Sequence, residues 1–163
     1  MVNQLSSLRK VSTVIMGLSL LGLLDSGYLT AHKLFGTPLT CGTSGGCEIV
    51  SQSPYSMIFG IPLSLIGMFF YLTMFFGALI YREFELVNVL KAVAVLSIAS
   101  IITSVWLVGV QLFIIEAVCI YCMISAGISL ILVTLGVYIL FISHRAKQQT
   151  SVPSPLPTAT DLE

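Results

Sequence analysis

Charged side chains are scarce in this sequence, where Asp, Glu, Lys and Arg together supply 9% of the 163 residues. Soluble domains average about 25%, so a soluble globular protein is excluded. Basic residues are few as well, with seven Lys and Arg against seven Asp and Glu, and they form no run. Without a basic patch, nucleic acid is not an expected partner. The class that fits this composition is a membrane protein.

Long apolar segments fill most of the chain, because 56% of the residues are hydrophobic. They cover residues 11–34, 60–81, 92–115 and 117–142. A helix of about 20 residues crosses a hydrocarbon core of about 30 Å, so each segment is long enough to span a membrane. The first is too long for a signal peptide and lacks its cleavage site. We therefore predict an all-α fold, an integral membrane four-helix bundle with a cysteine-bearing outside loop that contains a short amphipathic helix.

The basic residues predict the orientation of this bundle. Arg and Lys occur at positions 9–10, 82–91 and 145–147, all at one end of the segments, whereas the other end has only Lys33. By the positive-inside rule, both termini are expected in the cytoplasm. The opposite end then faces an oxidising compartment, in which disulfides form and persist.

Four cysteines are predicted at that oxidising end. Cys41 and Cys47 lie in the first outside loop, and Cys119 and Cys122 form a C-x-x-C at the outer mouth of the fourth segment. Two thiols three residues apart lie on one face of a helix, where they can open and close as a redox disulfide. Because this pair is placed at the edge of lipid, we expect an electron acceptor that is itself soluble in lipid, a quinone.

The first outside loop, residues 36–56, is the one substantial connection. Its glycines give the segment between the first two cysteines wide backbone freedom. An apolar pair within 47–52 predicts the short amphipathic helix, and Pro54 ends it. We expect a single transmembrane catalytic domain at 1–145 and a disordered tail rich in Pro, Ser and Thr at 146–163.

Asp25 is an ionisable residue at membrane depth in the first segment, and Tyr28 and His32 follow it on the same helical face. A carboxyl at this depth can serve a polar relay or contact a ligand inside the bundle. It can equally be hydrogen-bonded to another helix for packing alone. The sequence leaves both interpretations open.

Four interpretations of the cysteines compete. The thiols form a relay from a protein to a quinone, two inert structural disulfides, a zinc site, or ordinary buried thiols in a channel or scaffold. A disulfide between Cys119 and Cys122 closes a very small ring, which is a poor staple but is easily reduced. Zinc is disfavoured because the spacing of Cys41 and Cys47 is unusual for it and structural zinc rarely sits at a lipid surface. We therefore expect the relay and no metal.

Several motifs resemble the bacterial branch of the vitamin K epoxide reductase family. They are Cys41 and Cys47 in a Gly-rich loop, Ser53-Pro54-Tyr55, Gly60-Ile61-Pro62-Leu63-Ser64, Gly67, Tyr71, and Cys119-Ile120-Tyr121-Cys122. The resemblance covers residues 11–142. Another four-helix quinone-linked thiol oxidase, the disulfide-bond B type, has the opposite order of cysteine pairs and ranks below.

The resemblance implies a role for each cysteine. Cys119 and Cys122 would be the active-site pair, with Cys122 beside the quinone ring, and Cys41 and Cys47 would be the shuttle pair. Electrons would pass inward through a mixed disulfide between Cys47 and Cys119. Ser53 matches a family serine near the catalytic loop. The donor would be a thioredoxin-like or DsbA-like protein of the periplasm or lumen, separate from these 163 residues or part of a longer parent chain.

The implied activity is a membrane thiol oxidoreductase of the bacterial inner membrane or thylakoid, which reduces ubiquinone, menaquinone, phylloquinone or a similar quinone and supports disulfide formation in exported proteins. Vertebrate members, which reduce vitamin K epoxide, are similar but place an asparagine and a tyrosine at the positions we match to Leu63 and Ala126. Epoxide reduction is therefore the runner-up, and a disulfide-stapled membrane scaffold is the contrasting non-enzymatic hypothesis. From depth, we expect the quinone pocket to include Phe59, Leu63, Phe113 and Ala126 beside Cys122.

Overall fold

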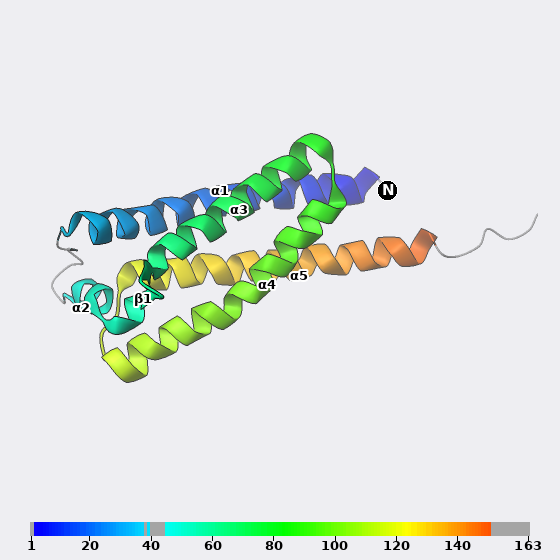
Figure 1. The fold of residues 1–163 in the computed structure, drawn as a ribbon. Coiled ribbons are helices and arrows are strands. Elements are labelled where there is room, and N and C mark those ends of the chain that lie inside the picture. Colours follow the sequence, from blue (N-terminus) through cyan, green and yellow to red (C-terminus); the bar gives the residue numbers. More distant parts are fainter. Residues whose placement is uncertain (1, 38, 40–44, 151–163) are drawn as a thin grey trace, which may run out of the picture.

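The computed structural model describes residues 2–37, 39 and 45–150. Its framework is four long helices, α1 (Val2–Phe35), α3 (Leu63–Phe84), α4 (Val87–Val110) and α5 (Ile120–Thr150) (Figure 1). Each contains an apolar stretch long enough to cross a membrane. The predicted all-α fold with four membrane spans is confirmed.

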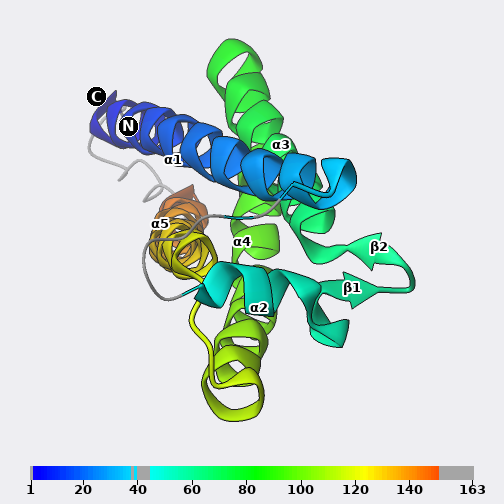
Figure 2. The same cartoon turned by 90° about the vertical axis from the view of Figure 1, so that its left-hand side faces the viewer.

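The short elements gather at one end of the bundle (Figures 1 and 2). Helix α2 (Gly46–Gln52) is the predicted amphipathic helix of the outside loop, and it ends before Pro54. A 3₁₀ turn, η2 (Pro54–Ser56), leads into an antiparallel hairpin of β1 (Met57–Ile58) and β2 (Ile61–Pro62). This hairpin displaces the start of the second span, which begins at residue 63 rather than at residue 60.

Helices α1 and α3 pack against each other, as do α4 and α5. Glycines allow these approaches, since a Cβ on Gly22 would overlap the ring of Tyr71, and one on Gly136 would overlap the hydroxyl of Ser97. Membrane helices commonly use small residues in this way, because close backbone approach supplies the contacts that hold them together. The resulting core consists of Leu8, Ile15, Tyr71, Met74, Ala78, Tyr81, Leu90, Val93, Ala94, Ile128, Leu132 and Ile139.

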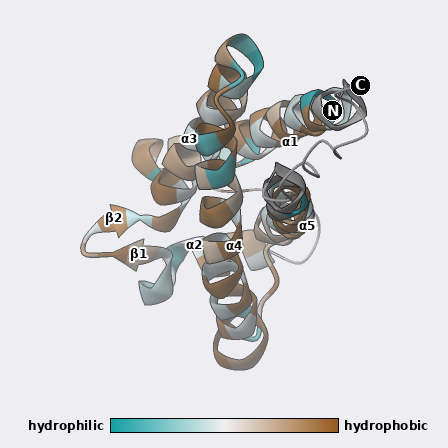
Figure 3. Cartoon of the chain, turned by 90° about the vertical axis from the view of Figure 1, so that its right-hand side faces the viewer, coloured by the Kyte–Doolittle hydropathy of each residue, from teal (hydrophilic) through white to brown (hydrophobic). Residues whose placement is uncertain are grey.

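The outer surfaces of the long helices are apolar (Figure 3). Large side chains such as Leu24, Phe69, Ile102 and Leu130 are more than half exposed. An apolar exterior of this extent is what lipid requires and water would oppose.

The two ends of the bundle differ in what they carry. The start of α1, the connection between α3 and α4 and the end of α5 lie together at what we call the termini end (Figure 1). Helix α2, the hairpin and the segment before α5 lie at the opposite end, the cysteine end. Helix α5 continues to Thr150, so residues 146–150 of the predicted tail are helical. Residues 151–163 lie outside the described ranges.

Candidate thiol redox site

Cys47 and Cys119 are buried in the same small hydrophobic cluster at the cysteine end, although they are far apart in the sequence. Their side chains are 0% and 1% exposed, and Leu39 is buried with them. Cys122 packs against the cluster from α5. The fold therefore brings one predicted shuttle thiol to the predicted active-site pair. Cys41 lies outside the described residues.

The contact between α2 and the segment before α5 depends on a glycine. The backbone of Gly46 lies so close to Val118 that a Cβ there would overlap the Val118 carbonyl oxygen. Gly46 and Val118 immediately precede Cys47 and Cys119 in the sequence. This backbone contact therefore holds the two cysteine-bearing segments against each other.

Polar side chains fasten α2 to the rest of the cysteine end. The backbone N–H of Leu39 donates to the Glu48 carboxylate over 3.0 Å. Lys33, at the end of α1, donates to the carbonyl oxygen of Ser51 and, over 3.2 Å, to the hydroxyl of Ser56. Lys33, the basic residue predicted at this end, therefore links α1 to the outside loop.

Gln111 positions Cys119, a role that sequence reasoning missed. The chain leaves α4 through a π-helical turn, η3 (Gln111–Ile115), which ends at Glu116 with a positive φ of 53°. The side-chain oxygen of Gln111, which is 3% exposed, accepts a hydrogen bond from the Cys119 N–H at 3.0 Å. An amide at the end of an apolar span was the available signal, because a buried amide requires a partner.

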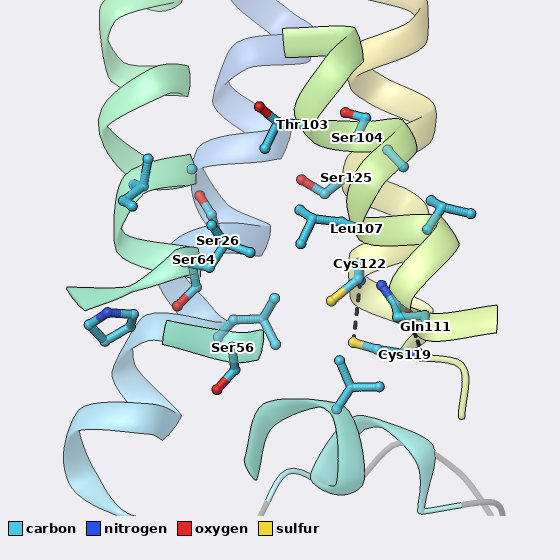
Figure 4. A pocket seen from close by; sticks show the side chains of 18 of the residues that line it. Ser26, Ser56, Ser64, Thr103, Ser104, Leu107, Gln111, Cys119, Cys122 and Ser125 are labelled. Atoms are coloured by element: carbon cyan, nitrogen blue, oxygen red, sulfur yellow. Dashed lines mark hydrogen bonds between the residues drawn. The ribbon is translucent and has the colours of Figure 1, made fainter. Parts of the chain in front are cut away.

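The C-x-x-C thiols are arranged for ionisation of the first one. Cys119 directly precedes α5, and its sulfur accepts a hydrogen bond from the backbone N–H of Cys122 over 3.4 Å (Figure 4). Hydrogen bonding from the Cys122 thiol, aided by backbone N–H groups, lowers the pKa of Cys119 to about 7, against the opposing effects of burial and the Asp25 carboxylate. Exchange requires a thiolate, and of the two thiols Cys119 is the one that ionises more readily.

The redox states of the described cysteines differ. Cys119 and Cys122 are free thiols, whereas Cys47 is disulfide-bonded. Within the described ranges, no group of three or more His, Cys, Asp or Glu side chains could hold a metal ion.

A cavity of about 360 Å³ opens beside the C-x-x-C, between α1, α3, α4 and α5. It is of the size that small organic ligands occupy. The sulfur atoms of Cys119 and Cys122 point into it, and Ser125 lies one turn further along α5 (Figure 4). Its other lining residues include Asp25, Ser26, Leu29, Leu63, Gly67, Phe70, Tyr71, Ser100, Thr103, Leu107, Ala126 and Ser129.

The residues predicted for the quinone pocket divide into two groups. Leu63 and Ala126 line the cavity, as does Cys122. Phe59 is at the tip of the hairpin, 100% exposed, and Phe113 is 83% exposed on η3. Neither phenylalanine lines the cavity, so this geometry does not support their predicted contact with a quinone. Depth in the membrane was a poor guide for both, because the hairpin and the π-helical turn direct them outward.

Ser53 also lines the cavity, between α2 and η2. Its hydroxyl donates to the carbonyl oxygen of Val50 over 2.8 Å, and its backbone N–H bonds to the same atom at 3.3 Å. The serine therefore closes the end of α2. Its predicted place near the cysteines is compatible with this position, and the contact it makes here is with the backbone.

The polar face predicted on α1 meets the C-x-x-C helix. The ring of Tyr28 lies 4.4 Å from that of His32 and 5.1 Å from that of Tyr121. His32 shares a hydrogen bond of 2.7 Å with Thr37. Asp25, by contrast, lines the cavity, and its buried Oδ2 has no hydrogen-bond partner.

Four membrane-spanning helices, with a buried loop cysteine beside a C-x-x-C at the mouth of an apolar cavity, define the class of an integral membrane protein with a candidate thiol redox site. The model of the vitamin K epoxide reductase family matches residues 13–137, and the chain belongs to that family. The thiol-disulfide oxidoreductase LTO1 of Arabidopsis thaliana is 42% identical over 50 residues. That match covers 30% of this chain and 13% of LTO1. The predicted family is therefore confirmed.

Proposed function

We propose that the protein passes electrons from a thioredoxin-like protein through Cys41 and Cys47 to Cys119 and Cys122, and from there to a quinone. The observation that carries this proposal is the burial of Cys47 and Cys119 in one cluster at the mouth of the cavity. A thiol relay requires that its two pairs come within reach of each other. The contact of α2 with the segment that precedes α5 supports the proposal, because it holds Cys47 beside Cys119.

The proposed thiol–disulfide exchange steps follow from the environment of Cys119. Reduced Cys47 attacks a Cys119–Cys122 disulfide at the Cys119 sulfur, and Cys41 then resolves the Cys47–Cys119 mixed disulfide. Cys119 leaves readily because its pKa is lowered to about 7, and thiols of lower pKa are better leaving groups. The reduced pair can then deliver two electrons to an acceptor in the cavity and reform its disulfide.

The cavity fits a quinone. Its wall is mainly apolar, which suits a ring with a lipid tail, and Cys122 and Ser125 supply polar atoms at one side. Leu63 and Ala126 offer no hydrogen-bond donor to an epoxide oxygen, which favours plain quinone reduction over the vertebrate-type reaction. A quinone accepts electrons when bound here, while the chain contributes the dithiol, the exclusion of water and the orientation.

We further propose that the cysteine end faces the periplasm or the lumen and that both termini are cytoplasmic. The termini end carries Arg9, Lys10, Arg82, Lys91 and Arg145, whereas Lys33 at the cysteine end is engaged by Ser51 and Ser56. This charge asymmetry is the positive-inside pattern. It supports an orientation in which the thiols face the compartment where exported proteins acquire their disulfides.

The test is quinone reduction by the purified protein in detergent or liposomes, followed by the absorbance of the quinone. We expect Cys119→Ala and Cys122→Ala to abolish reduction with either a thioredoxin-like donor or dithiothreitol. Cys41→Ser and Cys47→Ser should block the protein donor and spare dithiothreitol, which can reach the inner pair directly. Equal loss with both reductants would remove the shuttle role. If the parent protein leaves the quinone unchanged with both reductants, the protein is better described as a disulfide-stapled scaffold.

A further inference from the structure

We infer that Asp25 is the proton donor to the bound quinone, an inference that rests on the proposed function. The described residues contain three buried side-chain oxygens that have no hydrogen-bond partner, on Ser19, Asp25 and Ser143. Of these residues, Asp25 alone lines the cavity. Buried polar atoms are nearly always satisfied, so an orphaned carboxyl oxygen beside a ligand cavity indicates a ligand atom as its partner.

Among the groups that line the described part of the cavity, Asp25 is distinguished by a buried carboxyl oxygen that has no protein partner. Tyr71 is committed, because its hydroxyl bonds to the Ser125 carbonyl oxygen at 2.9 Å and to the hydroxyls of Ser125 and Ser129 at 2.8 and 3.2 Å. Ser26 donates to the carbonyl oxygen of Gly22 at 2.7 Å. These groups are held by the protein, whereas Oδ2 of Asp25 is not.

The number of protons consumed in quinone reduction indicates a role for the Asp25 carboxyl. Reduction of a quinone to a quinol consumes two electrons and two protons. Both electrons come from Cys119 and Cys122 as their S–S bond forms, but when Cys119 is a thiolate only the Cys122 thiol brings a proton. The Asp25 carboxyl supplies the second proton and is left as a carboxylate. A carboxylate and a thiolate in one apolar cavity repel each other, so the neutral acid is the form that suits the reduced dithiol.

The cavity also provides a route for Asp25 to regain its proton. Both Asp25 and Lys33 line it, and they are eight positions apart on α1, which corresponds to roughly 12 Å along the helix. Ser51, Ser53 and Ser56 line the same cavity near Lys33 at the cysteine end. After the quinol has left, water that enters the empty cavity at this end can pass these polar groups and return a proton to Asp25, whereas a bound quinone keeps water out.

The first test is infrared difference spectroscopy, which follows the carboxyl group itself during a single reduction of quinone. The chain holds one other aspartate, Asp161, so protein made with carboxyl-labelled aspartate in an Asp161→Asn background reports on Asp25 alone. We expect a protonated-carboxyl band in the reduced protein, shifted by the label and lost in time-resolved spectra while one equivalent of quinone is being reduced, before Asp25 regains its proton. A band that stays unchanged throughout quinone reduction, or the absence of any labelled band, would overturn the inference.

The second test separates proton donation from folding and from thiol exchange. Asp25→Asn should reduce quinone on the order of 100-fold more slowly, as expected for a lost general acid, and Asp25→Glu should restore much of the rate. Reduction of the Cys119–Cys122 disulfide by dithiothreitol in a single turnover should stay unchanged in both. Ser19→Ala, at another unpartnered buried oxygen outside the cavity, is the matched control and should keep the parent rate. Parent-like quinone reduction by Asp25→Asn contradicts the inference, whereas an inactive parent contradicts the proposed function instead.

Discussion

At the termini end of the bundle, α1, α3, α4 and α5 close around a continuous core, whereas at the cysteine end α4 contributes almost nothing to a core. Helix α4 buries Leu90, Val93, Ala94 and Ser97, and its next buried residue is Val110. Several residues between these positions face the cavity. The same four helices therefore form a tightly packed core at one end and surround a cavity at the other.

This difference separates stability from reactivity. Contacts in the core are numerous and shared among four helices, so the free energy of unfolding depends mainly on the termini end. At the cysteine end, single contacts hold the thiols: Gly46 on Val118, and Gln111 on Cys119. A substitution in the core should therefore change the free energy of unfolding more than the rate of thiol exchange. A substitution at the cysteine end should do the opposite, and the following changes test that separation.

Gly46→Ala should have the largest effect on activity. The added Cβ would overlap the Val118 carbonyl oxygen, so α2 must move away from the segment before α5. A displacement of about 1 Å between reacting groups can cost roughly 100-fold in rate, and we expect a loss of this order in quinone reduction by a thioredoxin-like donor. Gly127→Ala, where the Cβ meets no atom within 4 Å, is the control. Equal rates for the two variants would show that the contact between Gly46 and Val118 does not control electron transfer from the donor to the quinone.

Leu132→Ala should have the largest effect on stability. Leu132 is fully buried in the core, and removing such a side chain costs about 2–5 kcal/mol of unfolding free energy because a cavity remains. Leu107→Ala, at the wall of the existing cavity, should cost less than about 1 kcal/mol. Denaturant unfolding in mixed micelles measures both. Similar costs would mean that the two ends are equally packed.

Gln111→Leu should have a smaller effect and act on both properties. The substitution leaves the buried Cys119 N–H without its acceptor, which costs about 1–3 kcal/mol. It also frees the segment that carries the reactive thiol, so exchange with dithiothreitol should slow. Unfolding and single-turnover exchange are measured beside Asn88→Leu, an exposed amide at the termini end. If Gln111→Leu matches that control in both measurements, the hydrogen bond has no positioning role.

The smallest predicted effect is a shift in the pH dependence of Cys119. Because only the thiolate reacts and the pKa of Cys119 is about 7, alkylation should rise with pH to a plateau above neutrality and decline as pH falls below 7. The first cause of the lowered pKa is the Cys122 thiol as a hydrogen-bond donor. Removing this donor should raise the pKa toward the ordinary value of about 8.5.

The measurement compares Cys122→Ala with Cys122→Ser, both in a Cys41→Ser, Cys47→Ser background in which Cys119 is the single thiol. The serine variant keeps a hydroxyl donor and should titrate at lower pH than the alanine variant, by about one pH unit. Coincident alkylation profiles would show that the donor at position 122 does not control ionisation.

Local patterns were sufficient to predict much of this protein. Four apolar stretches of spanning length dictate four helices, because a membrane leaves the backbone no other way to satisfy its hydrogen bonds. The C-x-x-C at the start of the last stretch and the short helix that contains Cys47 were both accessible from local spacing and the apolar pattern.

What the sequence alone determined, then, is the number of membrane spans and the presence of a C-x-x-C at the start of the last one, since these follow from composition and local spacing. Tertiary structure decided which groups meet. It turned Phe59 and Phe113 away from the cavity, set Gln111 on Cys119 and left the Asp25 carboxyl without a protein partner. Apolar residues that face lipid and those that face a ligand are alike in sequence, because both avoid water. Only the rotation and crossing of packed helices distinguish them.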